Sequence, residues 1–210
     1  MDALGVIFIA AAMLAAPAAQ DSVPPADGAC ELHVWPGSGL GSVYHGWFHG
    51  GIVNGAVTGR DGYPQVPPNP IDTPVQRELL EAAQPQRLLQ LDGHKLVMHD
   101  EALSSRVIRS TPGRIDPSAS TCYAELIVDD VLLQQDWVNG SFLRVSFRYR
   151  DFGAGQTPSR AFGTWVKAPL AGFSPKRPLD ADKLPDEFRS AFTRNISLFA
   201  DALRKPAKKP

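Results

Sequence analysis

The strongest constraint on the fold is a strict alternation of apolar and polar residues over eight consecutive positions, 143–150. The apolar members are Leu143, Val145, Phe147 and Tyr149, and the polar members are Arg144, Ser146, Arg148 and Arg150. Because successive side chains of a strand point to opposite faces of a sheet, this period of two predicts an antiparallel strand with one buried face. Asn139-Gly140, just before it, is typical of a hairpin turn and predicts a preceding strand in the same sheet.

Further strands are predicted over 31–35, 95–99, 123–128 and 161–167, where short apolar runs stand between turn signals. A first helix is predicted to begin at Thr73, with Thr73 and Gln76 as a capping box and Pro74 at the first helical position. Pro85 should break or bend this helix.

A second long helix is predicted near the end of the chain, capped by Asp180 or Asp182. Its apolar stripe recurs at steps of three and four residues and consists of Phe188, Phe192, Ile196, Phe199 and Leu203. Residues 100–121 are polar and are expected to form a surface loop. The order of elements predicts a single α+β domain over 30–204, with one mixed, mainly antiparallel sheet and two covering helices.

The first residues of the chain are typical of a secretory signal. Residues 6–19 carry no charge and are too few to span a bilayer, which needs about 20 apolar residues. The Ala16-Pro17-Ala18 pattern predicts cleavage after Ala18, which gives a signal peptide over 1–18 and a disordered leader over 19–29. A basic tail follows the domain at 205–210. We therefore expect a periplasmic or cell-envelope location.

The two cysteines, Cys30 and Cys122, agree with export to an oxidising compartment. Each stands directly before a strand-like run. Two parallel, neighbouring strands could therefore be joined by a disulfide at the same end. The alternative is a pair of unpaired buried cysteines.

The two strand starts, Cys-Glu-Leu-His-Val-Trp-Pro and Cys-Tyr-Ala-Glu-Leu-Ile-Val, together with Phe-Arg-Tyr-Arg-Asp-Phe-Gly at 147–153, resemble a group of uncharacterised exported proteins of Gram-negative bacteria. This resemblance implies location and fold and brings no activity with it. The order of elements is also faintly similar to the α/β domain of curli-type envelope assembly lipoproteins.

An insertion over 36–60 is rich in glycine, and the 28 residues 32–59 contain no charged side chain. Gly51, Gly55 and Gly59 form a row at helical spacing, and Trp47 and Phe48 would suit a membrane interface. Two interpretations stay open: a flexible loop, or a segment that associates with a membrane or with another copy through 37–60. A stiff, proline-rich connector follows at 61–74.

Motifs for known chemistry are few. His45 and His49 would share one face of a helix, as zinc ligands can, but no glutamate follows His45 as in a zinc-protease helix. The glycines after 36 do not match a nucleotide-binding loop. A net charge of −1 argues against a nucleic-acid partner.

Arg144, Arg148 and Arg150 would form a positive ladder on one face of the sheet, either as an anion-binding surface or as an ordinary solvated face. No catalytic residue and no cofactor are predicted. The sequence favours an exported, non-enzymatic binding or assembly component whose Gly-rich segment contacts a membrane or another copy. It does not indicate a small-molecule ligand. The alternative is a periplasmic enzyme, metal-assisted through His45 and His49.

Overall fold

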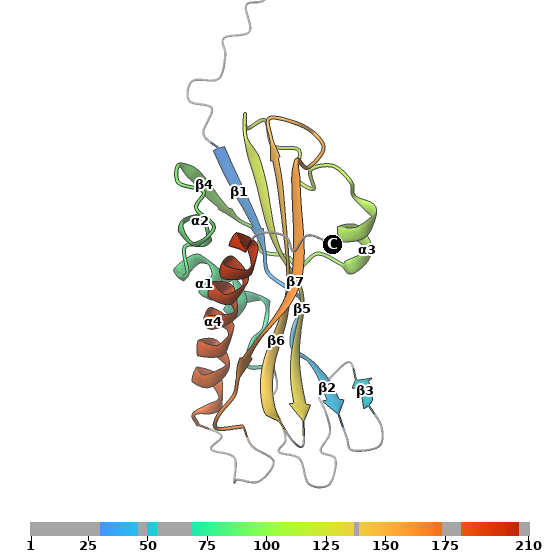
Figure 1. The fold of residues 1–210 in the computed structure, drawn as a ribbon, viewed down its shortest axis with the longest axis vertical. Coiled ribbons are helices and arrows are strands. Elements are labelled where there is room, and N and C mark those ends of the chain that lie inside the picture. Colours follow the sequence, from blue (N-terminus) through green and yellow to red (C-terminus); the bar gives the residue numbers. More distant parts are fainter. Residues whose placement is uncertain (1–29, 46–49, 54–68, 137–138, 174–181, 206–210) are drawn as a thin grey trace, which may run out of the picture.

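The computed structural model describes residues 30–45, 50–53, 69–136, 139–173 and 182–205 (Figure 1). Within these residues the protein is a seven-stranded mixed sheet with helices packed mainly on one face. The expected α+β class is confirmed. The expected signal peptide, leader and basic tail lie almost wholly outside the described residues, as does most of the proline-rich connector.

The sheet is organised around the long strand β5. The strands are β1 (Cys30–Trp35), β2 (Gly41–His45), β3 (Gly50–Val53), β4 (His94–Met98), β5 (Tyr123–Asp136), β6 (Gly140–Gly153) and β7 (Arg160–Pro169). The antiparallel ladders β5–β6 and β6–β7 are the longest, whereas β1 pairs with both β4 and β5 in parallel. The alternation at 143–150 lies in β6, as predicted.

Strands β1 and β2 lie one after the other along the same edge of β5. Trp35 is paired with Ile127 and Gly41 with Leu132, both in parallel register. The start of the Gly-rich segment therefore connects β1 to β2, two strands that pair with successive parts of β5. Strands β2 and β3 then form an antiparallel hairpin. For these residues the structure corrects the expected conformation, because β2 and β3 are strands, neither flexible loop nor helix. Association with a membrane or with another copy stays a prediction.

The helices are α1 (Thr73–Ala82), α2 (Pro85–Leu88), α3 (Ser105–Ser110) and α4 (Leu184–Arg204). Figure 1 shows α1, α2 and α4 on one side of the sheet and the short α3 on the other. Phe199 of α4 packs on Phe147 of β6 and Phe162 of β7, with ring centroids 5.1 Å and 5.7 Å away. All five residues of the predicted α4 stripe are buried, so the stripe is confirmed.

Two predicted caps are wrong. Asp72 caps α1 by accepting a hydrogen bond from the Val75 amide at 2.9 Å, because Thr73 is already helical and donates its hydroxyl to the Gly37 carbonyl instead. Helix α4 begins after Lys183 and has no side-chain cap. The break at Pro85 is confirmed, since α2 begins there.

The predicted disulfide is present. Cys30 and Cys122 are bonded, with Cα atoms 4.5 Å apart, and the Glu31 amide donates to the Cys122 carbonyl at 2.9 Å. Both cysteines stand at the same end of the parallel pair β1–β5, which is the arrangement that the sequence suggested. None of the helices formed by the described residues is long and apolar enough to cross a membrane.

Candidate functional site

Two histidines meet beside β1 and form the centre of a polar cluster, which we call the His33 cluster: Glu31, His33, His99, Asp116 and Ser118. Glu31 and His33 lie two residues apart on β1 and share a face of the sheet. His99 follows β4, where its amide donates to the Val34 carbonyl at 2.9 Å. Asp116 and Ser118 come from the loop before β5.

The side chains of the His33 cluster are in mutual contact. His33 Nδ1 lies 2.9 Å from His99 Nε2, and Asp116 Oδ2 lies 3.8 Å from the first atom and 3.9 Å from the second. On its other side, His33 Nε2 lies 3.1 Å from Glu31 Oε2, which also accepts the Ser118 hydroxyl. His33 is buried, with 3% of its surface exposed, whereas the side chains of Glu31, His99 and Asp116 are partly exposed.

The hydrogen-bond partners assign the histidine tautomers. An ionised glutamate only accepts, so His33 donates Nε2–H to Glu31 and presents the lone pair of Nδ1. His99 then donates its Nε2–H to His33 Nδ1. The hydrogen bond from Ser118 lowers the pKa of Glu31, and burial, followed by the nearby His33, lowers the pKa of His99. Both shifts favour an ionised Glu31 and a neutral His99.

Neighbouring residues hold the cluster in position. The indole of Trp35 stacks on the His99 ring, with centroids 4.0 Å apart and planes 7° from parallel. The loop that carries Asp116 is held by β5, because the Asp116 amide donates to the Tyr123 hydroxyl at 3.2 Å. That hydroxyl in turn donates to buried Glu125 at 2.9 Å. Burial raises the pKa of Tyr123, which keeps it protonated as a donor.

A cavity of about 350 Å³ opens directly beside the cluster. It is lined by Trp35, His99, Asp100, Glu101, Ala102 and Leu103. Two acidic residues are thus among those that line it, and one of them, Asp100, is paired with Arg77 at 2.9 Å. This arrangement can hold a small polar ligand or a cation.

On the face of the sheet turned away from α4, cationic side chains lie over aromatic rings. At its far end, Arg144 lies over the Trp165 ring at 4.2 Å and Lys167 over the Phe142 ring at 4.5 Å. Trp165 is 38% exposed. We call Phe142, Arg144, Trp165 and Lys167 the cationic–aromatic patch.

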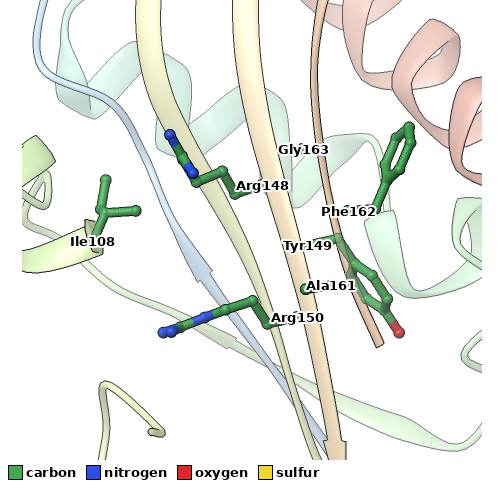
Figure 2. A pocket seen from close by; sticks show the side chains of 7 residues that line it. All are labelled: Ile108, Arg148, Tyr149, Arg150, Ala161, Phe162 and Gly163. Carbon is green, nitrogen blue, oxygen red and sulfur yellow. The ribbon is translucent and has the colours of Figure 1, made fainter. Parts of the chain in front are cut away.

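The three arginines of the predicted ladder have different neighbours: Arg144 lies over an aromatic ring, whereas Arg148 and Arg150 are paired with carboxylates. Arg150 bonds to Glu125 at 2.6 Å and Arg148 to Asp129 at 2.8 Å, so these two positive charges face carboxylates. In Figure 2 both arginines extend towards Ile108, on the side opposite to Tyr149 and Phe162. The hollow drawn there has a volume of about 210 Å³ and is lined by Ile108, Arg148, Tyr149, Arg150, Ala161, Phe162 and Gly163. Anion binding by the ladder stays a prediction.

Most of the other predicted site residues lie outside the described residues. His45 ends strand β2, so it does not share a helical face with His49, which lies outside the described residues. Gly51 lies in β3, while Trp47, Phe48, Gly55 and Gly59 also lie outside. His45 pairs with Asp136 and His33 with Glu125, so the two histidines are about 35 Å apart along β5.

Sequence reasoning did not find the His33 cluster. Its two histidines are 66 residues apart in the chain and come together only because β1 and β4 pair in parallel. The available signal was a histidine within one predicted strand and another at the end of a second. That signal becomes informative only once the two strands are known to be neighbours.

Comparison with known proteins adds little about function. No family model and no curated protein matches this chain. Among solved structures, the Xanthomonas campestris protein XCC0632, of family DUF330, matches with a TM-score of 0.39 and 10% identity over 83% of this chain and 81% of that one. A second, uncharacterised protein matches with a TM-score of 0.32 and 11% identity over 82% and 85%.

The chain is thus similar in structure to uncharacterised proteins, the DUF330 protein among them. At TM-scores below 0.5 we base no argument on the likeness. Neither protein is described as a curli-type assembly lipoprotein, so that likeness stays an expectation from the order of elements.

Proposed function

We propose that this protein is exported to the bacterial cell envelope and acts there as a non-enzymatic component that binds a membrane surface. The N-terminal signal-like segment supports export, and the Cys30–Cys122 disulfide suits an oxidising compartment. The contact surface combines the cationic–aromatic patch with the Gly-rich segment over 37–60.

The observation that carries the proposal is the position of β2 in the sheet. Val43 pairs with Gln134 of β5, which pairs with Phe142 of β6, so the Gly-rich segment joins the sheet about 10 Å from the patch. The Gly-rich segment, whose sequence carries Trp47 and Phe48 and no charge, therefore joins the same sheet as exposed Trp165, half-buried Arg144 and exposed Lys167.

These residue types match the chemistry of an anionic bilayer surface. Tryptophan favours the headgroup region, where its ring lies against apolar chains and its N–H reaches polar groups. Arg144 and Lys167 would add attraction to anionic lipids of about 1 kcal/mol each. Their aliphatic stems and the Phe142 ring provide apolar area beneath the charges.

Vesicle co-sedimentation tests the proposal. The full chain should bind vesicles rich in phosphatidylglycerol and should bind phosphatidylcholine vesicles weakly. Changing Arg144→Gln together with Lys167→Gln should weaken binding about thirtyfold, in line with two lost interactions of about 1 kcal/mol. Trp165→Ala should weaken it as well.

Matched controls separate the patch from net charge. Lys95→Gln with Lys205→Gln removes two charges from exposed positions on β4 and at the end of α4, and should leave binding nearly unchanged. Val107→Ala removes an apolar side chain that is as exposed as Trp165, at 38%. Equal loss in patch and control variants, or no binding by the wild type, would overturn the proposal.

Point changes suit the Gly-rich segment better than deletion, because removing 37–60 would also remove β2 from the sheet. Trp47→Ala with Phe48→Ala should reduce vesicle binding. Oligomers that form without vesicles and disappear on Gly55→Leu would instead favour self-association.

A further inference from the structure

The His33 cluster brings two imidazoles and a carboxylate to one point, and this inference is independent of the membrane proposal. We propose that His33, His99 and Asp116 bind one divalent transition-metal ion of the zinc class. Two nitrogen donors with one carboxylate oxygen form a ligand set that zinc commonly takes. The donor atoms are His33 Nδ1, His99 Nε2 and Asp116 Oδ2.

The spacing of the donor atoms fits a metal ion. Their separations are 2.9, 3.8 and 3.9 Å. A point equidistant from the corners of such a triangle, in its plane, lies about 2.1 Å from each, which is the length of a zinc–nitrogen or zinc–oxygen bond. An ion can therefore be placed at bonding distance without moving the strands that carry the histidines.

The surroundings of His33 are those of a metal ligand. A ligating histidine usually donates its second ring N–H to a carboxylate, which fixes the tautomer and the ring orientation. Glu31 provides this acceptor at 3.1 Å from His33 Nε2 and is itself held by Ser118. His33 thus presents a lone pair at Nδ1. For His99 to ligate, its proton moves from Nε2 to Nδ1.

A cavity lies beside one of the three proposed ligands, His99. Three protein ligands leave at least one coordination site for water or a small ligand. His99 lines this cavity of about 350 Å³ together with Asp100 and Glu101. Asp100 is paired with Arg77 at 2.9 Å, and Glu101 adds a negative charge that attracts cations. Trp35 stacked on His99 keeps that ring in place.

A second grouping in the protein is excluded by its chemistry. Cys30, Cys122 and His94 also lie within ligand distance of one another, but both sulfur atoms are joined in the disulfide. The experiment must therefore use oxidised protein, since reduction would release two competing thiolates.

Zinc titration calorimetry on the oxidised full chain tests the proposal, together with metal content after dialysis. The wild type should bind one equivalent of Zn²⁺. His99→Ala and Asp116→Asn, which alter half-buried side chains, should weaken binding about 100-fold or more. Glu31→Gln should weaken it by about 10- to 100-fold, since it removes the charge that supports His33.

His94→Ala is the matched control, because His94 begins the strand β4 that His99 follows. It should bind zinc as the wild type does. Zinc should also raise the melting temperature of the wild type and of His94→Ala, and should leave that of His99→Ala unchanged. Absence of zinc binding by the wild type, or binding by His99→Ala and Asp116→Asn that is as tight as that of the wild type, would overturn the proposal.

Discussion

At the scale of single residues, buried polar side chains decide how distant segments are held together. Gln76 of α1 is fully buried and bonds to the segment between β1 and β2: its Oε1 accepts from the Gly37 amide at 2.9 Å. Its Nε2 donates to the Ile71 carbonyl at 3.0 Å. A Cβ on Gly37 would lie 2.9 Å from Val128 Cγ1, so only glycine allows this close approach. The predicted role of Gln76 in a capping box gave no hint of this contact.

Replacing Gln76 by leucine should lower the free energy of unfolding by about 1–3 kcal/mol, because the Gly37 amide and the Ile71 carbonyl would be buried without partners. Chemical denaturation followed by circular dichroism measures the change. Gln86→Leu is the control, since Gln86 Oε1 already lacks a hydrogen-bond partner. Equal destabilisation by both changes would contradict the assigned role of Gln76.

Asp130 should make stability depend on pH. Burial, followed by the nearby Asp129, raises the pKa of the Asp130 carboxyl. A raised carboxyl pKa means that the folded state holds the proton to a higher pH than the unfolded state does. The stabilising contribution of protonated Asp130 to the folded state is therefore present at low pH, and it is lost as the pH rises through the pKa of Asp130 in the folded state.

Asp130→Asn should accordingly be more stable than the wild type at pH 7, with the difference shrinking below about pH 3, where carboxyl groups are protonated. Thermal unfolding across this range measures it. Asp182→Asn, at an exposed position, is the control. An Asp130→Asn protein that is less stable than the wild type at pH 7 would refute this expectation.

At the scale of elements, the amphipathic pattern of each segment determined its position well. Helix α4 covers the sheet with the stripe that its sequence spacing predicted, and the apolar residues of β6 face it. Element ends were less well determined, because Asp72 and Thr73 are both good capping residues and the choice between them depends on Gly37, to which Thr73 bonds. The Gly-rich segment carried no clear periodicity, and its strands form through pairing of β2 with β5 and of β3 with β2.

Truncating Phe199 of α4 to alanine should lower the free energy of unfolding by about 3–5 kcal/mol, because the ring fills the core between β6 and β7. Arg194→Ala, at an exposed position of the same helix, should change it by less than about 0.5 kcal/mol. Denaturant titration measures both. A small effect of Phe199→Ala would mean that α4 is not essential to the core.

At the scale of the whole molecule, parallel pairing of β1 with β4 and β5 gathers residues from three distant parts of the chain. The disulfide lies at one end of β1, the His33 cluster lies along it, and the cationic–aromatic patch lies at the other end of β5–β7. The two proposed sites are thus separated along the sheet, and each can be tested without disturbing the other.

The disulfide should contribute measurably to the stability of the whole domain. It closes a loop between residues 92 apart, so its loss in Cys30→Ser with Cys122→Ser should lower the free energy of unfolding by up to about 4–5 kcal/mol. Denaturation of the variant beside oxidised and reduced wild type measures this. Equal stability of all three samples would contradict a structural role for the bond.

The sequence by itself predicted the α+β class, strand β6, the buried face of α4 and the disulfide. These depend on the order of elements, on local periodicity and on the presence of only two cysteines, each directly before a strand-like run. Only the tertiary structure decided that 36–60 contributes a hairpin to the sheet and that His33 meets His99 and Asp116. Both depend on which strands become neighbours. Which strands pair depends on packing and backbone hydrogen bonding between segments far apart in the chain, so no local sequence pattern predicts the pairing.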